Sequence, residues 1–512
     1  MKKYYLKLLL VFLILGCSKN DTVTKIEEEG EGEVVEVEEE VVNLAPNEFE
    51  IEIIDVSHES ATISWNQAVD PENDAVTYDL YLNQNLIVES VSELTHQFID
   101  LTELSDYTGQ IIAKDTNGNE TSKTFSFTTI KYYLKYLKAY DYGETDYGIG
   151  YASGRPYKMI KTFDKNYLII GASIRPNGNA YQFFVLKIDY EGNELWKKFY
   201  DYNLYDLINP SVTEYSNGFI VTGANHIINI DNEGNLIWYK NIDDFGLSSN
   251  TININSVKND SNNDFYLAGL KGPSEPGGGN EAVLLKIDVL GNIIWDKYYS
   301  VSLLDSFEEI YINSQNELII LGSIENSGMT WEEFVNGSSS GPQVDFWVVK
   351  LSNDGEIIWQ NTYGDGRYDF PENIFLRNNG NFIISGYGWG VRDVSNGRIF
   401  EIDPFGNEVW NTTTELSYMY SIAETRDNNL IATGYVVIDR YGALGLYKYD
   451  SQGVEQWNRK LKDTYTYLYG HEVLPEEDGG YRIAASRSKN YYYDDEKPEI
   501  LIYKTDPEGN YE

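Results

Sequence analysis

One hairpin recurs seven times after residue 185 and constrains the fold more than any other feature of the chain. In each copy an alternating strand runs into a turn spelled Asp-x-x-Gly-Asn or close to it, usually with a Trp three residues past the Asn position. The turn glycines are Gly192, Gly234, Gly291, Gly355, Gly406, Gly453 and Gly509, and Trp196, Trp238, Trp295, Trp359, Trp410 and Trp457 follow the first six. Self-similarity at a period of roughly 40–65 residues is the signature of a propeller or another repeat array.

Each repeat contains a second recurring half, in which a polar turn precedes an apolar β-run. These runs end at Gly171, Gly223 and Gly386, with weaker copies that end at Gly269, Gly322, Gly434 and Ala485. Two hairpins make four strands per repeat, and four strands form one propeller blade. We therefore expect an all-β fold in which residues 131–512 form a seven-bladed β-propeller.

The seventh repeat supplies three strands, so its outer strand has to come from elsewhere in the chain. The segment Tyr132–Tyr140, just before the first repeat, has the character of the outer strand Leu195–Tyr200. We expect this N-terminal strand to complete the last blade and to leave no open edge in the ring.

The spacing Asp-x-x-Gly-x-x-x-Trp resembles the tryptophan-docking repeat of quinoprotein-like (PQQ-type) propellers, which include outer-membrane assembly lipoproteins without the cofactor. The resemblance implies a blade but no particular activity. Quinone dehydrogenases of that family use a vicinal Cys pair, whereas Cys17 is the only Cys here, so we expect no cofactor. We also expect no metal, because each turn offers one Asp, and Asp and Gly are ordinary turn residues.

Residues 44–130 contain short alternating runs separated by turn residues, a pattern that predicts an antiparallel sandwich. Trp65, the segment Leu101–Tyr107 and the turn Ala113–Asn119 resemble the buried Trp, the tyrosine corner and the F–G turn of fibronectin type III modules. The Pro that usually precedes the corner Tyr is absent. The resemblance implies a spacer module, with ligand binding as the less common role.

The N-terminal region carries the features of a lipid-anchored export signal. Residues 1–16 combine lysines with a short apolar run, which predicts a signal peptide, and they end before Cys17 in a sequence that resembles the bacterial lipobox. The resemblance implies cleavage before Cys17 and lipidation of that residue. Residues 17–43 are rich in Glu, which predicts a disordered tether and resembles the surface-export signals of some Gram-negative lipoproteins. We expect an outer-membrane protein that is displayed on the cell surface, attached to the membrane through its lipid anchor only.

The net charge of −42 leaves no basic surface for nucleic acid, so we expect no nucleic-acid partner. Catalytic motifs are equally sparse: the four His residues have no metal-ligand spacing, and no nucleophile elbow or phosphate loop is present. We therefore assign no catalytic residue. For carbohydrate chemistry, the carboxylates to test are those predicted to lie in long loops, namely Glu332, Glu333, Asp369 and Glu372.

The tight turns of every repeat should lie at one rim of the ring, which places all long connections at the opposite rim. Long loops on a compact scaffold are disproportionately functional. The aromatic residues of these loops are the predicted ligand-binding residues: Trp331, Phe334, Trp389, Tyr465, Tyr467, Tyr491 and Tyr492. They suit stacking on sugar rings or docking of a peptide, and we expect a non-enzymatic protein that recognises a glycan or a partner protein.

Two other functions stay open from the sequence. The propeller could scaffold outer-membrane proteins from the periplasmic side, as a monomer or as part of an envelope complex. The third candidate is a carbohydrate-active enzyme, a lyase or a hydrolase.

Overall fold

The chain divides into two units, Met1–Tyr132 and Tyr133–Glu512. The computed structural model describes residues 43–141, 155–174, 181–204, 210–245, 247, 252–273, 278–326, 343–364, 368–389, 395–438, 441–462, 466–489 and 499–511. No helix within these ranges has the length and apolar character that crossing a membrane requires.

The first unit contains two antiparallel sheets. One has the order β1-β2-β5 and consists of Ile51–Val56, Ala61–Trp65 and Thr95–Phe98. The other has the order β4-β3-β6-β7 and consists of Asn85–Val91, Thr77–Leu82, Asp106–Lys114 and Glu120–Thr128.

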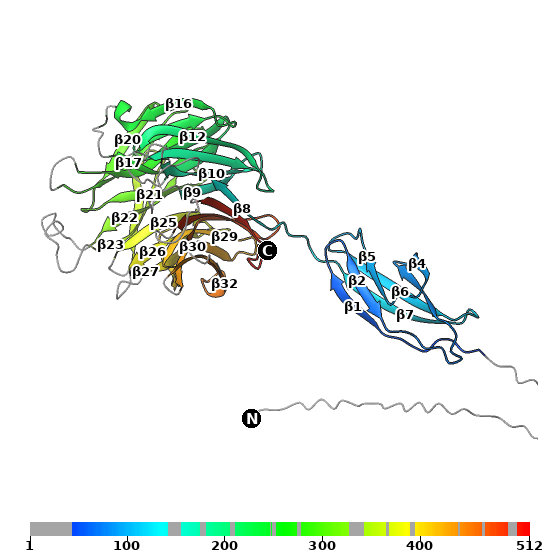
Figure 1. Cartoon of the computed structure of the whole chain (residues 1–512). Coiled ribbons are helices and arrows are strands. Elements are labelled where there is room, and N and C mark those ends of the chain that lie inside the picture. The colour runs from blue at the N-terminus through cyan, green and yellow to red at the C-terminus, as the bar shows by residue number, and fades with distance from the viewer. Residues whose placement is uncertain are drawn as a thin grey trace, which may run out of the picture. The chain divides into compact units, whose positions relative to one another are not determined.

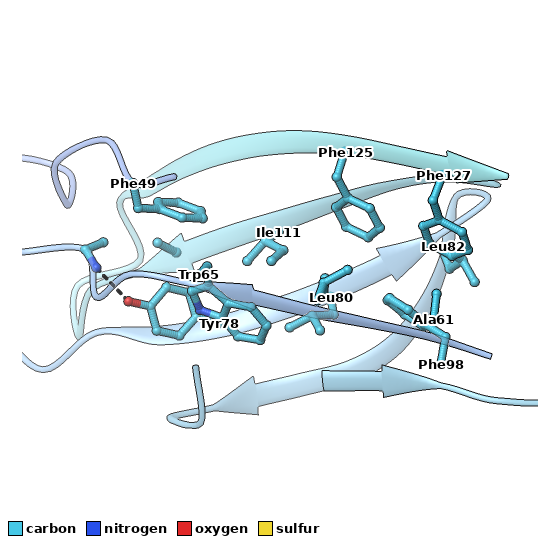
Figure 2. Packing of buried hydrophobic residues seen from close by; sticks show 13 residues of the cluster. Phe49, Ala61, Trp65, Tyr78, Leu80, Leu82, Phe98, Ile111, Phe125 and Phe127 are labelled. Carbon is cyan, nitrogen blue, oxygen red and sulfur yellow. Dashed lines mark hydrogen bonds between the residues drawn. The ribbon is translucent and has the colours of Figure 1, made fainter. Parts of the chain in front are cut away.

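An apolar core holds these two sheets together. Figure 2 shows Trp65 beside Tyr78, and their ring centroids lie 5.6 Å apart in an edge-to-face arrangement. The Tyr78 hydroxyl accepts a hydrogen bond of 2.8 Å from the backbone N–H of Ala68. A second tyrosine, Tyr107, accepts a hydrogen bond of 2.8 Å from the backbone N–H of Thr102. Each Tyr thereby fixes a loop to the core without leaving its hydroxyl unsatisfied.

The described part of the second unit contains seven four-stranded antiparallel sheets. Their first strands are β9 Arg155–Lys161, β13 Ser211–Tyr215, β17 Ile252–Asn259, β21 Ser306–Ile312, β25 Asp369–Leu376, β29 Tyr418–Glu424 and β33 Thr466–Pro475. The second strands are β10 Tyr167–Ile174, β14 Gly218–Gly223, β18 Phe265–Lys271, β22 Leu318–Glu325, β26 Phe382–Trp389, β30 Leu430–Ile438 and β34 Tyr481–Lys489.

The third strands are β11 Tyr181–Ile188, β15 His226–Ile230, β19 Glu281–Ile287, β23 Val344–Leu351, β27 Ser395–Ile402, β31 Tyr441–Tyr449 and β35 Glu499–Lys504. The outer strands are β12 Glu194–Leu204, β16 Leu236–Asn241, β20 Ile293–Tyr299, β24 Ile357–Tyr363, β28 Glu408–Thr414, β32 Glu455–Leu461 and β8 Tyr136–Asp141. One 3-10 turn, η1 Ile242–Phe245, follows β16.

The first strands of these sheets form a closed ring. Each first strand contacts the first strand of the next sheet, from β9 through β13, β17, β21, β25 and β29 to β33, and β33 contacts β9 again. The other strands of each sheet follow outward in order (Figure 1). This arrangement of sheets around a central channel is a β-propeller.

Neighbouring sheets are joined at the outer rim by the Trp of the recurring hairpin. The Trp196 ring packs against Gly234 in the hairpin turn of the next sheet, and its Nε1 donates a hydrogen bond of 3.1 Å to the Asn232 carbonyl. Each later Trp packs in the same way on the turn glycine of the following repeat, ending with Trp457 on Gly509. These glycines have φ between +75° and +83°, and a side chain on any of them would meet the neighbouring side chains. Glycine is therefore required at this position for two reasons: the turn needs a positive φ, and the docked ring leaves no room for a side chain.

The Asp of each hairpin has a structural role. In the first repeat the Asp189 carboxylate accepts hydrogen bonds of 2.7 Å from the Asn193 backbone N–H and 2.9 Å from the Asn193 side-chain amide. Ser352, which replaces the Asp in the fourth repeat, accepts a hydrogen bond of 3.1 Å from the Glu356 backbone N–H. Among the described residues, no group of three or more His, Cys, Asp or Glu side chains is placed to hold a metal ion.

The predicted closing strand is present as β8, which pairs with β35 and completes the seventh sheet. Tyr136 lies opposite Lys504 in this pair, as Trp196 lies opposite Lys187 in the first sheet. It packs against Gly192, so it takes the place of the Trp that the seventh repeat lacks. Tyr140 donates a hydrogen bond of 2.5 Å to the Gly192 carbonyl, as Tyr200 does at 2.6 Å to Gly234. The ring closes through the same docking interaction that joins its other sheets.

Replacing Tyr136 tests this closure. Tyr136→Ala should lower the free energy of unfolding of the second unit by roughly 3–5 kcal/mol, because a docked aromatic ring is lost from the joint between the first and seventh sheets. Leu137→Ala, on the same strand at 44% exposure, should change it by less than about 0.5 kcal/mol. Urea denaturation followed by circular dichroism measures both. Equal midpoints for the two variants would contradict the role of Tyr136, as would a stable propeller after deletion of residues 132–140.

Candidate functional site

The strand order places the two kinds of connection at opposite rims. A tight turn follows each inner strand, as at Thr162–Asn166 after β9, and another follows each third strand, as at Asp189–Asn193 after β11. These turns share one rim because the strands of a sheet alternate in direction. The longer connections therefore share the other rim, and every inner strand begins there.

Six of the seven inner strands carry a bulge near the long-connection rim. In β25, for example, Pro371 pairs with Gly386 and Asn373 pairs with Ser385, so Glu372 has no partner on the second strand. The other bulged residues, each skipped in the same way, are Tyr157, Asn255, Glu308, Tyr420 and His471. A bulge re-aims one side chain and is common next to functional sites.

A close approach of the second strand accompanies five of these bulges. A Cβ atom on Gly386 would lie 1.9 Å from the Phe370 carbonyl oxygen of the inner strand. The same contact, at 1.9–2.0 Å, excludes a side chain at Gly171, Gly269, Gly322 and Gly434. In the seventh sheet the glycine has moved to the inner strand as Gly470, and Ala485 lies opposite it. In these five sheets the glycine that ends the apolar run is therefore required by the bulge, whereas Gly223 belongs to the sheet without one.

All six bulged side chains line one cavity of about 310 Å³ in the central channel. The complete lining consists of Arg155, Tyr157, Lys158, Pro210, Asn255, Glu308, Glu309, Pro371, Glu372, Tyr387, Tyr420 and His471. A volume of this size is at the lower end of the range for small-molecule sites. The cavity is the candidate functional site.

Buried ion pairs form the part of the lining that lies further from the long-connection rim. The Nζ atom of Lys158 lies 3.4 Å from Glu309 and 3.8 Å from Glu472, on the fourth and seventh sheets. Lys258 approaches Glu309 to 2.8 Å. Burial opposes these charges, but the carboxylates outweigh it and raise the pKa of Lys158, and the two lysines hold the pKa of Glu309 below its usual range. Lys158, on the first sheet, thus forms ion pairs with residues of the fourth and seventh sheets.

Two carboxyl groups of the cavity favour their neutral form. Burial, reinforced by Glu309, raises the pKa of Glu308 to about 7, although Ser306 donates a hydrogen bond to it. Burial raises the pKa of Glu372 to about 8, and the nearby carboxyl groups, among them Glu308, add to this effect while Lys158 opposes it. Carboxyl groups with such pKa values gather at functional sites more often than elsewhere.

Aromatic rings form the wall contributed by the fifth, sixth, seventh and first sheets. The ring of Tyr420 stacks on His471 at 5.6 Å, and Tyr157 lies 6.4 Å from His471 on the other side. Tyr387, on β26, stands edge-on to Tyr420 at 6.2 Å. Burial, with Arg155 nearby, lowers the pKa of His471 to about 3, so this ring is neutral, and its Nε2 lies 2.8 Å from the Ser486 hydroxyl.

Of the predicted ligand-binding residues, the structure describes two, Trp389 and Tyr467, and neither lines this cavity. Trp331, Phe334, Tyr465, Tyr491 and Tyr492 lie outside the described residues. Trp389 is the last residue of β26, with 46% of its surface exposed, and its ring lies 5.8 Å from Tyr368 and 6.1 Å from Phe370. Tyr467 is half-buried on β33, so it belongs to a strand and not to a loop.

The carboxylates chosen for testing separate into different environments. Glu332 and Glu333 lie outside the described residues. The expectation that Asp369 and Glu372 lie in a long loop is wrong, because β25 continues through its bulge and includes both residues. Asp369 is buried and pairs with Arg398 at 2.8 Å, which makes it structural, whereas Glu372 points into the cavity lining.

A constant spacing in the sequence marks the bulged cavity residues that the sequence analysis did not predict. The bulged residue precedes the residue that ends the apolar run by fourteen positions in all six sheets, from Tyr157 and Gly171 to His471 and Ala485. The spacing is constant because a fixed inner strand, tight turn and second strand separate the two positions. Sequence reasoning concentrated on loops and did not search the inner strands for it.

No family model matches this chain, and neither does any curated protein. Solved structures with a similar course of the chain include a glucose dehydrogenase, 12% identical, which covers 57% of this chain and 95% of its own length at a TM-score of 0.33. The β-propeller domain of the Trilobed protease from Pyrococcus furiosus is 9% identical. The match covers 69% of this chain and 95% of that domain, at a TM-score of 0.39. A Synechocystis apocarotenoid oxygenase mutant is 12% identical. The match covers 73% of this chain and 92% of the oxygenase, at a TM-score of 0.37. The activities of those proteins are not carried over to this one.

The shifted pKa of Glu372 predicts a particular dependence of stability on pH. The folded state holds a proton on Glu372 up to about pH 8, whereas the unfolded chain releases it near its ordinary value of 4.5. This group therefore lowers stability as the pH rises from 4.5 to about 8. Glu372→Gln should be more stable than the parent protein above about pH 8 and should lose this advantage in acid.

Thermal unfolding at several pH values measures the difference. Glu191→Gln, at an exposed position in a hairpin turn, is the matched control for the loss of one carboxyl group. A pH-independent difference for Glu372→Gln would show that its carboxyl group titrates normally.

Proposed function

We propose that this protein is a non-enzymatic, lipid-anchored recognition protein that binds a glycan in the central channel of a seven-bladed propeller. The ligand enters from the long-connection rim, where the inner strands begin. The first unit, which we assign to the fibronectin type III modules, serves as a spacer between the anchor and the propeller.

One observation carries the proposal: the six bulged side chains converge on a single cavity with aromatic walls. A pyranose ring presents an apolar face and a rim of hydroxyl groups. The apolar face of the sugar can stack on the aromatic rings of Tyr157, Tyr387 and Tyr420. Its hydroxyl groups can form hydrogen bonds with Asn255 and the carboxyl groups of the lining. A cavity of about 310 Å³ accommodates one or two such rings.

Three features of the first unit support its assignment. The sheet orders β1-β2-β5 and β4-β3-β6-β7 divide seven strands in the way expected for that module. Trp65 is buried at 4% exposure, and the Tyr107 hydroxyl binds the backbone a few residues upstream, as in a tyrosine corner.

A glycan array with the chain from residue 18 onward tests the binding function. Tyr420→Ala should weaken binding of any retained glycan by about tenfold or more, because a stacked aromatic contact is worth over 1 kcal/mol when truncated. Trp389→Ala, outside the cavity, should leave affinity within about twofold. Thermal melts verify that both variants fold.

The reverse pattern, with binding lost in Trp389→Ala alone, would place the site on the outer loops. Retention of proteins but no glycans would make the ligand a partner protein. Shortening of a bound glycan over time, abolished in Glu308→Gln, would identify the protein as a carbohydrate-active enzyme.

Protease treatment of intact cells tests the location. Because we assign Cys17 as the lipid anchor and residues 18–43 as an exposed tether, protease should release the propeller from cells whose outer membrane is intact. Protection until the membrane is permeabilised would contradict surface display and favour the scaffold function on the periplasmic side. A Cys17→Ser variant should appear in the soluble fraction in either case.

A further inference from the structure

Three polar side chains of the cavity have no internal partner. Within the described residues, no hydrogen bond or salt bridge engages the carboxyl group of Glu372, and none engages the hydroxyl groups of Tyr387 and Tyr420. Glu372 and Tyr420 are bulged residues on adjacent sheets, and Tyr387 lies between them on β26. All three residues are half-buried and line the cavity, so a ligand there can supply the hydrogen bonds that the protein does not.

The neighbouring ionisable groups are already paired. Lys158 and Lys258 both approach Glu309, and Lys158 also approaches Glu472. Glu308 accepts hydrogen bonds of 2.8 Å from the Asn255 amide and 2.6 Å from the Ser306 hydroxyl. Glu372 is thus the carboxyl group of the cavity lining that, within the described residues, has neither an ion pair nor a hydrogen-bond donor.

Arg155, the second cationic lining residue of the first sheet beside Lys158, has a different neighbour. The guanidinium of Arg155 lies 5.5 Å from the ring centre of Tyr469, whereas Glu372 belongs to the fifth sheet. Glu372 forms no ion pair within the described residues, so a cation can bind its carboxylate without displacing one, although the charge of Arg155 also acts on Tyr420. An ammonium group would donate a charge-assisted hydrogen bond to the carboxylate and gain cation–π attraction from the rings.

The charge of the whole protein favours the same ligand. A net charge of −42 attracts cationic molecules and repels anionic ones at long range. A neutral sugar would leave Glu372 protonated, and an anionic one would meet its carboxyl group and the field of the protein.

We propose that the glycan recognised in this cavity carries an amino sugar whose unsubstituted ammonium group binds the Glu372 carboxylate between Tyr387 and Tyr420. This assignment rests on the proposed function, since it names the ligand class of the same site. N-Acetylation removes the charge and the ammonium donors, so the cavity selects against acetylated amino sugars.

Binding is coupled to release of a proton. The groups that face Glu372 are Glu308 and Glu309 on β21, Glu472 on β33 and Lys158 on β9, and together with burial they hold its pKa at about 8. A bound cation favours the ionised carboxylate, so the proton leaves as the amino sugar enters at neutral pH.

Calorimetric titration compares two oligosaccharides of equal length, de-N-acetylated and fully N-acetylated chitooligosaccharide. The chain from residue 18 onward should bind the amine form about tenfold or more tightly, as expected for a charge-assisted hydrogen bond. Glu372→Gln should bring the ratio of the two affinities close to one. Glu191→Gln, remote from the cavity, should keep the ratio of the parent protein. Repeating the titration in buffers of different ionisation enthalpy should reveal proton release by the parent and none by Glu372→Gln.

The outcomes separate this inference from the proposed function. Equal or tighter binding of the acetylated form would overturn the amino-sugar assignment and leave glycan recognition intact. Failure of both forms, with another glycan retained on the array, would also overturn it. If the array retains no glycan either, the proposed function is wrong. Binding of an oligolysine peptide with the same dependence on Glu372, but not of the sugar, would assign the ammonium group to a protein ligand.

Discussion

A close contact between the first two strands of each sheet determines what the centre of this propeller contains. In five sheets a glycine of the second strand meets a carbonyl oxygen of the inner strand at a distance that no side chain tolerates. The inner strand accommodates this contact with a bulge, and the bulge turns one extra side chain toward the channel. Because six of the seven inner strands carry the bulge at the corresponding position, the six side chains converge on one cavity. The ligand site thus depends on a backbone feature that the repeat preserves, while the residue at the bulge is free to vary.

The stability of the ring arises mainly at the opposite edge of the sheets. Docked Trp rings and Tyr136 bury apolar surface on the neighbouring hairpins, and the third strands are largely buried. This outer framework allows the centre to contain groups that destabilise the folded state by themselves. Partly buried ion pairs such as Lys158 with Glu309 seldom stabilise a fold, and the unpartnered Glu372 lowers stability as the pH rises from 4.5 to about 8.

Sequence reasoning predicted the framework well and the site poorly. The recurring hairpin, the structural Asp and the closing strand near Tyr136 follow from local patterns, because each depends on a few consecutive residues. The cavity is assembled from residues on different sheets, and Glu372 is the one among them that the sequence indicates as a candidate, although it lies on a strand and not in the expected loop. The constant spacing of fourteen residues between Tyr420 and Gly434, repeated in the other bulged sheets, contains the missing information. Its meaning becomes clear only once the glycine is known to face the bulge.

The central claim is that the bulged residues form the ligand site. A crystal structure of the chain from residue 18 onward, soaked with the de-N-acetylated oligosaccharide, tests it directly. The account predicts density for a sugar ring within the channel, with its amine nitrogen in hydrogen-bond contact with Glu372 and a ring face toward Tyr420. Density on the outer loops beside Trp389, with the channel filled by water alone, would contradict it.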